Sequence, residues 1–207
     1  MIFVFIIIFI LTLFSVDGSN SSLPEDNTDK DFMNCSPFLY LQYTQAINEK
    51  RWLHGVPPLV LDTTNKDLVE FVQGFVDHGA EKRPDLPVRP PIAFSQFYGV
   101  YPKTDCSPEE DIRELYAIGD AYPFYGQEPP PKSIDPEYYR YYAFTQLIWA
   151  ASRRVFIACS DYGDYRHMLV AFLPPGNIKG EYVRNVRRPR EGKNDLDDLK
   201  KATNATE

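Results

Sequence analysis

Two stretches in the C-terminal half of the chain decide its fold. The first reads Phe144-Thr145-Gln146-Leu147-Ile148-Trp149 and continues as Ala150-Ala151-Ser152-Arg153-Arg154-Val155. The second reads Pro174-Pro175-Gly176-Asn177-Ile178-Lys179-Gly180-Glu181-Tyr182 and continues to Asn185-Val186. A third stretch, nearer the N-terminus, reads Asn48-Glu49-Lys50-Arg51, then His54-Gly55-Val56-Pro57-Pro58-Leu59 and Asp62.

The N-terminal end has most features of a secretory signal peptide. Ile2 to Phe14 is nearly all apolar, but this run is too short to span a bilayer. Val16 and Gly18 supply the small-x-small pattern of a cleavage site. The run is not preceded by Lys or Arg, which departs from the usual pattern. We interpret residues 1–18 as a signal peptide, with an uncleaved anchor as the alternative.

The rest of the chain divides into three parts. We expect a mobile leader at residues 19–35, one packed domain at residues 36–187 and a disordered charged tail at residues 188–207. A hydrophobic content of 43% and an aromatic content of 14% are ample for a packed core. The net charge of −7 argues against a nucleic-acid partner, because phosphate contacts need a basic surface. No other segment is apolar and long enough to predict stable membrane insertion.

Cysteines and sequons agree with an oxidising, extracellular location. The three cysteines are Cys35, Cys106 and Cys159, of which two are expected to form a disulfide. The sequence leaves all three choices of pair open. Sequons for N-glycosylation occur at Asn20, Asn34 and Asn204.

Local patterns predict two helices in the first half of the chain. The first helix begins with a Ser36 hydroxyl cap and Pro37, and it ends near Leu53, before Gly55. Its shared face is formed by Phe38, Leu41, Gln45 and Asn48. The second helix is expected to end at Gly79. It carries an apolar stripe formed by Leu68, Phe71, Val72, Phe75 and Val76.

Two further helices and a hairpin follow. Ser107-Pro108-Glu109-Glu110 has the spacing of a capping box and opens the third helix, whose buried face is Ile112, Leu115 and Tyr116. A fourth helix is expected to begin at Asp135-Pro136 and to run to about Trp149. Val155–Cys159 and Met168–Phe172 predict an antiparallel hairpin with its turn at Gly163. Residues 92–98 are expected to form a strand or an extended loop, and the proline-rich residues 123–131 neither helix nor central strand.

In order and spacing, the three quoted stretches resemble the secreted CAP family (cysteine-rich secretory proteins, antigen 5 and pathogenesis-related 1, also called SCP). The resemblance extends from about residue 38 to residue 186. It implies an α+β fold, an α-β-α sandwich whose small, three-stranded antiparallel core sheet is flanked by about four helices.

The resemblance also implies a cleft, and here the chain departs from the family. Many members hold two histidines and two acidic residues there, a set that can bind zinc through imidazole and carboxylate lone pairs. The histidine that precedes Phe-Thr-Gln in the family falls on Ala143. The two glutamates fall on Val100 and Ile118, and the segment before Gly99 offers no histidine. The expected site is therefore a degenerate tetrad without catalytic residues, metal ligands or cofactor.

The remaining candidates for chemistry are interpreted as structural. His54 is expected to form hydrogen bonds within its loop, His78 to sit at a helix C-terminus and His167 to face solvent at the start of a strand. Ser152 and Ser160 lack the Gly-x-Ser-x-Gly signature of a serine nucleophile. Thr145 and Gln146 are expected to satisfy buried backbone groups beside the cleft.

A cluster of aromatic residues suggests a ligand site. Phe124 and Tyr125 lie in the proline-rich loop, and Tyr138 and Tyr142 lie beyond it. Such residues offer apolar area with polar tips, and a loop at this position has been linked to sterol binding in the family. The alternative is that these rings simply cover the core.

We therefore expect a secreted, non-catalytic domain that binds an extracellular partner. A sterol or fatty acid is the first expected ligand and an extracellular protein the second. The alternatives are a metal-dependent or serine-type hydrolase with a rebuilt site and an inert structural remnant.

Overall fold

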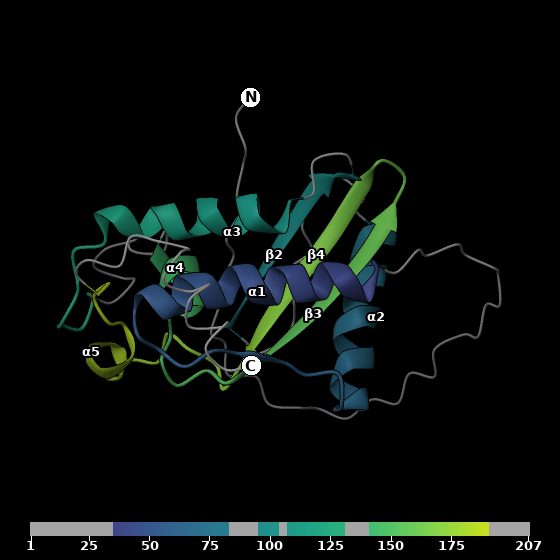
Figure 1. Ribbon diagram of the computed structural model, residues 1–207. Helices are drawn as coiled ribbons and strands as arrows, with labels where there is room; N and C mark the ends of the chain where they lie inside the picture. The colour runs from purple at the N-terminus through teal and green to yellow at the C-terminus, as the bar shows by residue number, and fades with distance from the viewer. Residues whose placement is uncertain (1–34, 83–94, 104–106, 131–140, 191–207) are drawn as a thin grey trace, which may run out of the picture.

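The computed structural model describes residues 35–82, 95–103, 107–130 and 141–190 (Figure 1). Its helices are α1 (Pro37–Leu53), α2 (Lys66–Lys82), α3 (Pro108–Ala117), α4 (Tyr142–Leu147) and α5 (Tyr182–Asn185), with a 3₁₀ turn, η2, at Ile118–Ala121. Its strands are β1 (Val60–Leu61), β2 (Ser95–Pro102), β3 (Arg154–Tyr162) and β4 (Tyr165–Leu173). The sequons at Asn20, Asn34 and Asn204, together with Cys106 and Tyr138, lie outside the described residues.

The sheet has four strands in the order β1-β3-β4-β2. β3 and β4 form the predicted hairpin, which pairs Arg154 with Leu173 at one end and Tyr162 with Tyr165 at the other. β2 pairs antiparallel with β4, so the predicted three-stranded antiparallel sheet is present. The fourth strand, β1, is only two residues long and pairs parallel to β3. A run this short carries no sequence pattern, and therefore the sequence did not reveal it.

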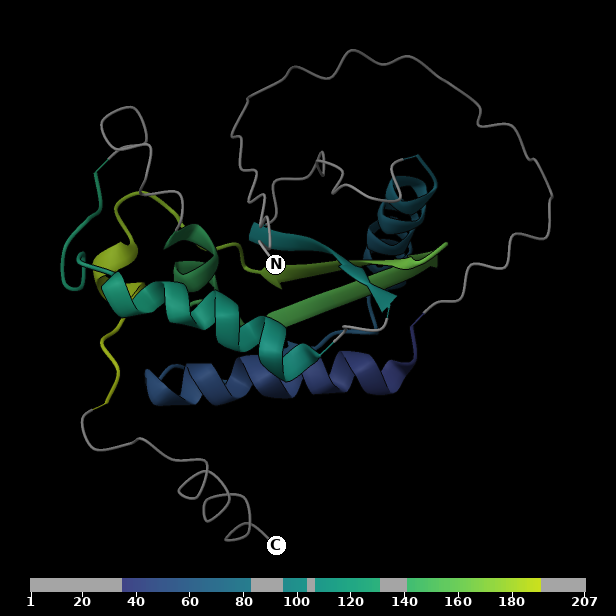
Figure 2. The ribbon, with the colours of Figure 1, turned by 90° about the horizontal axis from the view of Figure 1, so that it is seen from above.

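Helices cover both faces of the sheet, as the α-β-α prediction requires. Figure 2 shows α2 on one side of the strands and α1 on the other, with α3 alongside α1. The larger core cluster joins α1, α3 and α4 to Val155, Met168 and Phe172 of the sheet. A smaller cluster, which lies under α2, joins Val72 and Val76 to Ala158 and Leu169.

Several predicted boundaries differ from the structure. Ser36 precedes α1, but its side chain makes no cap hydrogen bond. Gly79 does not end α2, because it lies buried within the helix, which continues to Lys82. Gly55 does follow α1 with φ +62°, the left-handed conformation that a glycine allows. Within the described residues α4 begins at Tyr142, and it ends at Leu147 rather than at Trp149.

The buried face of α1 is the opposite of the one that the sequence suggested. Phe38 and Leu41 are 66% and 57% exposed. The residues of α1 that are buried are Tyr43, Thr44, Ala46, Ile47 and Arg51. This difference has a physical cause, since α1 packs through a tyrosine and an arginine whose polar ends are satisfied inside the fold.

Arg51 is the central polar residue of this packing, and its side chain is fully buried. Nη1 donates to the carbonyls of Leu147 and Trp149, both at 2.9 Å. Nε donates to the carbonyl of Pro57 at 2.9 Å, and Nη2 to that of Ser152 at 3.0 Å. Burial lowers the pKa of Arg51 to about 9, and the charge of Arg153 acts in the same direction. The side chain therefore remains charged at neutral pH and joins α1 to the segment that follows α4.

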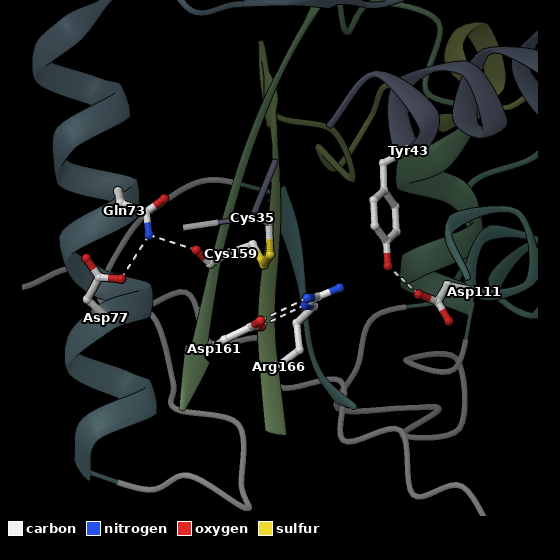
Figure 3. The surroundings of a disulfide bond; sticks show 8 residues. All are labelled: Cys35, Tyr43, Gln73, Asp77, Asp111, Cys159, Asp161 and Arg166. Carbon is white, nitrogen blue, oxygen red and sulfur yellow. Dashed lines mark hydrogen bonds and ion pairs between the residues drawn. A yellow bond between two sulfur atoms is a disulfide. The ribbon is translucent and has the colours of Figure 1, made fainter. Parts of the chain in front are cut away.

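A second buried polar contact joins α1 to α3. The Tyr43 hydroxyl donates to the carboxylate of Asp111 (Figure 3). Burial raises the pKa of Asp111 to about 6, although the Tyr43 hydrogen bond lowers it and the carboxylates of Glu114 and Glu110 raise it further. Ionisation of Asp111 is thus less favourable in the folded chain than in the unfolded chain.

The disulfide joins Cys35 to Cys159, with 5.5 Å between the Cα atoms and a sequence separation of 124 residues. It ties the start of α1 to the middle of β3, as Figure 3 shows. Cross-linking two residues so far apart restricts the unfolded chain strongly. One of the three pairings that the sequence left open is thereby selected.

None of the helices in the described ranges combines the length and the apolar character that a membrane span requires.

Arg51→Met is expected to lower the free energy of unfolding by about 3–5 kcal/mol, because four buried carbonyl groups lose their donors. Arg51→Lys keeps the charge but loses the planar fork, so its effect should fall between wild type and Arg51→Met. Arg113→Met, which alters an exposed arginine of α3, serves as the control and should change the free energy by less than about 0.5 kcal/mol. Urea unfolding at pH 7 measures all three, and equal effects of Arg51→Met and Arg113→Met would contradict this role.

Asp111→Asn tests the buried carboxyl. Because its folded pKa, about 6, lies above its ordinary value of 3.8, the stability of the wild type should fall as the pH rises from about 4 to about 6. The variant lacks this ionisation, so the wild type should lose about 1–3 kcal/mol relative to it over that range. Glu109→Gln, at an exposed position of the same helix, should show a nearly constant difference from wild type. Urea unfolding across this pH range gives both curves, and parallel curves for wild type and Asp111→Asn would refute the proposed ionisation.

Candidate functional site

The candidate site surrounds α4, which is held by the Pro174–Tyr182 loop. The Thr145 hydroxyl oxygen lies 2.6 Å from the side-chain oxygen of Asn177 and 3.0 Å from the carbonyl of Tyr141, and both oxygens are acceptors for its one hydrogen. Gln146 accepts from the backbone N–H of Gly176 at 2.8 Å. Thr145 and Gln146 are thus structural, as predicted, and they explain why the two stretches that decide the fold occur together.

Close packing makes Gly176 necessary in this arrangement. A Cβ atom at Gly176 would overlap the Gln146 side chain and approach the Trp149 ring. Trp149 is fully buried and stands edge-on to Tyr182, with 5.1 Å between the ring centroids. The Pro174–Tyr182 loop therefore packs directly against the end of α4.

Ala143, the position at which the resemblance places a histidine, is 3% exposed. It belongs to the larger core cluster together with its neighbour Phe144, and Ile118 packs against the same cluster. A Cβ atom at Gly119 would overlap the Phe144 ring, so η2 and α4 are in close contact here. The surroundings of Ala143 are accordingly apolar and tightly packed.

Val100 is not brought to the same place. In β2, Phe97 and Tyr101 pack against the larger cluster, whereas Tyr98 packs against the cluster under α2. Because side chains alternate along a strand, Val100 lies on the same face as Tyr98, and it pairs with His167 of β4. Of the three expected tetrad positions, the structure brings Ile118 and Ala143 to one cluster and puts Val100 on the other face of the sheet.

His54 has the structural role that the sequence predicted. Its Nδ1 lies 2.5 Å from the carbonyl of Arg187, and its Nε2 lies 2.9 Å from the hydroxyl of Tyr116. Burial lowers the pKa of His54, which favours the neutral ring at pH 7. Both ring nitrogens are engaged within the fold.

The prediction that His167 faces solvent is wrong. Its side chain is fully buried, and its Nδ1 lies 2.6 Å from the hydroxyl of Tyr98. Burial raises the pKa of Tyr98, and the nearby carboxylate of Asp77 acts in the same direction. His167 lies on the same face of β4 as Leu169, which packs under α2, and a sequence pattern within β4 alone does not contain that information. The third histidine, His78, is exposed on α2.

The two serines considered as nucleophiles occupy different structural positions. The Ser152 hydroxyl donates to the carbonyl of Pro174 at 2.9 Å and accepts from Gln146 at 3.2 Å. Ser160 pairs with His167 across the sheet, and its hydroxyl has no hydrogen-bond partner among the described residues. Both serines are fully buried.

One group of potential metal donors occurs among the described residues, namely Cys35, Cys159 and Asp161. Figure 3 shows that the two sulfurs form the disulfide and that the Asp161 carboxylate points to Arg166. Asp161 accepts from Nε and Nη2 of Arg166 at 2.7 and 2.9 Å. The lone pairs that a metal would need are thus already engaged, so this donor set does not fit a metal site.

Three of the four aromatic residues predicted to form a ligand site, Phe124, Tyr125 and Tyr142, are described and pack against the core. Two of these rings pack against the Tyr122 ring, whose centroid lies 5.7 Å from that of Phe124 and 4.9 Å from that of Tyr125. Tyr125 is also 6.5 Å from the ring of Phe144. Phe124, Tyr125 and Tyr142 are all half-buried against the larger cluster. Each ring thus contributes to covering the core, and the prediction that they also hold a ligand stays a prediction.

Glu128 is a residue that sequence reasoning missed. Its carboxylate accepts from the backbone N–H groups of Gly180 and Tyr182 at 2.9 and 2.8 Å. It thereby ties the proline-rich loop to the loop that seats on α4. The available signal was a single acidic residue within a proline-rich segment, which by itself does not identify its partners.

Comparisons with known proteins rest on structure. No family model matches the sequence, and no curated protein matches it. The solved structure of hookworm platelet inhibitor is 12% identical in sequence, with a TM-score of 0.51. The match covers 75% of this chain and 78% of the inhibitor chain. Na-ASP-1 is 13% identical, with a TM-score of 0.51, covering 78% of this chain; this chain spans only 45% of Na-ASP-1. NaASP2 with Zn²⁺ is 10% identical, with a TM-score of 0.47, covering 82% of this chain and 92% of its own.

Hookworm platelet inhibitor and Na-ASP-1 are CAP-family structures, and this chain is similar to both over most of its length. At this level of identity the likeness concerns the fold. The chain has the CAP fold.

Proposed function

We propose that this chain is a secreted, non-catalytic CAP domain that acts as an extracellular binding protein. The observation that carries the proposal is the position of Ala143, a buried alanine in an apolar cluster where the resemblance places a metal-binding histidine. The three histidines support it further, because they occupy separate environments at the end of α1, on α2 and under α2. A tetrad would require two imidazoles that converge on one point.

Secretion is supported by two independent features. Residues 1–18 have the pattern of a signal peptide. The Cys35–Cys159 disulfide is typical of an oxidising compartment.

A macromolecular partner is favoured over a sterol or fatty acid. A lipid ligand would need apolar surface that is free to receive it, whereas the rings of Phe124 and Tyr125 are already packed against Tyr122. Exposed apolar side chains instead occur on the outer surface, at Phe38 and Leu41 of α1. A surface of this kind can contact another protein or polymer without an internal cavity.

A hydrolase receives less support from the same geometry. The Ser152 hydroxyl donates a hydrogen bond to the carbonyl of Pro174, in the loop that packs against α4. Ser160 is fully buried on the face of the sheet that α2 covers. Both hydroxyls are fully buried, so a substrate could reach neither without rearrangement of the residues that cover them. The histidine that pairs with Ser160 across the sheet is His167, and its Nδ1 forms a hydrogen bond with the Tyr98 hydroxyl.

Ala143→His tests whether the former cleft is filled. The imidazole would enter a tightly packed cluster, so the free energy of unfolding should fall by about 1–3 kcal/mol in urea unfolding at pH 7. Ala117→His, at an exposed position of α3, is the matched control and should change it by less than about 0.5 kcal/mol. A variant that is as stable as wild type and binds zinc tightly would argue for an open, partly preserved site.

Secretion is tested by expressing the full chain in a eukaryotic cell. The chain should appear in the medium without residues 1–18 and with Cys35 linked to Cys159, as intact-mass and non-reduced peptide mass spectrometry would show. Retention of the uncleaved chain in the cell membrane would contradict the proposal.

A further inference from the structure

A group of basic side chains surrounds the C-terminal end of α1. Lys50 belongs to the last turns of the helix, and Arg187, Arg188 and Arg190 follow α5. Both ribbon views place the segment after α5 beside this end of α1 (Figures 1 and 2). We call these four residues the α1-end basic surface.

The backbone of the arginine segment is fixed to the end of α1. The N–H of Arg190 donates to the carbonyl of Leu53 at 2.9 Å, and Nη1 of Arg187 donates to the carbonyl of Gly55 at 2.9 Å. The carbonyl of Arg187 lies 2.5 Å from the His54 ring. A side chain at Gly55 would overlap the guanidinium of Arg190, so the absence of one lets this arginine lie flat against the turn.

Two of the four cations rest on aromatic rings. Lys50 Nζ lies 5.5 Å from the centroid of Tyr116, and Arg188 lies 5.0 Å from the centroid of Tyr125. Cation–π contact holds these side chains in place while their charged ends remain hydrated. Side chains that are already ordered lose less conformational entropy when they bind a partner.

The four charges are not neutralised within the described part of the chain. The arginines that form ion pairs there are Arg113, Arg154, Arg166 and Arg184. No residue of the α1-end basic surface makes such a pair with a described carboxylate. Among the described carboxylates, Glu49 precedes Lys50 in α1, and the charge of Asp120 lies close enough to raise the pKa of the Tyr116 and Tyr125 hydroxyls. The buried charge of Arg51 lies close enough to lower the pKa of His54 and adds to the positive potential.

We propose that the α1-end basic surface binds a sulfated polysaccharide. Clustered arginine and lysine side chains bind sulfate groups through charge and hydrogen bonds, and the binding releases counterions. The chain as a whole carries −7 charges, so an extended anionic surface such as a bilayer would be repelled by most of it. A single narrow polysaccharide can instead contact the basic surface alone. The inference deepens the proposed function and rests on it for the extracellular location.

The test uses the full secreted chain on heparin–agarose at pH 7.4, eluted with a sodium chloride gradient. Physiological ionic strength is ~0.15 M, and the wild type should stay bound above this sodium chloride concentration. Fully desulfated heparin should not retain it. The triple variant Lys50→Gln, Arg188→Gln, Arg190→Gln should elute earlier and bind heparin at least ~10-fold more weakly, because three charge contacts are lost.

The matched control is Lys66→Gln, Lys82→Gln, Lys179→Gln, which removes the same charge from exposed lysines elsewhere. It should elute close to wild type, and circular dichroism should show that both triple variants remain folded. Failure of the wild type to be retained would overturn the proposal, as would equal losses in the two variants. Equal or tighter binding to phosphatidylserine vesicles would assign the surface to membranes and would also overturn it. Neither result would bear on signal-peptide cleavage or on Ala143, which the preceding experiments measure separately.

Discussion

Arg51 donates hydrogen bonds to carbonyl groups from the loop after α1, the end of α4 and the segment before β3. A buried charge is tolerated only where its donors are satisfied, so these carbonyls have to stay where the guanidinium meets them. The planar fork of arginine suits this task, because it presents donors in fixed directions. Carbonyls at the end of a helix also carry partial negative charge, which offsets the cation without a carboxylate. Together with the apolar cluster that α1 and α4 share, this side chain fixes the end of α4 against α1.

The rest of the site follows from that placement. Once α4 is fixed, Thr145 and Gln146 meet Asn177 and Gly176, and the Pro174–Tyr182 loop is seated on the helix. Glu128 then ties the proline-rich loop to the same segment. These polar contacts stabilise the scaffold, and none of them involves the side chains at the expected tetrad positions. Alanine and isoleucine suit the apolar surroundings of Ala143 and Ile118, since unpaired charges in a packed core would be destabilising.

Local patterns predicted much of the fold. Two short-range signals were confirmed in part. Val72 and Val76 of the α2 stripe are buried, whereas Phe71 is 50% exposed. The Ser107 side chain accepts from the Glu110 N–H, as one half of the predicted capping box requires. The resemblance of the quoted stretches predicted the layered architecture. The sequence did not reveal that Cys35 pairs with Cys159, that His167 is buried or that Glu128 bridges two loops. Each of these depends on a partner that is remote in sequence, and the burial of a charged residue such as Arg51 runs against the usual preference of its type.

The most direct test of the central claim is a measurement of metal content. The claim is that the cleft of this CAP fold is occupied by apolar side chains around Ala143 and does not retain an ion. The full chain would be incubated with excess zinc, dialysed exhaustively and analysed by inductively coupled plasma mass spectrometry. The account predicts far less than one zinc per chain, the same level as in a matched Ala143→Val variant. One tightly retained zinc per chain, lost on changing His54 or His167 to alanine in a variant that remains folded, would contradict it.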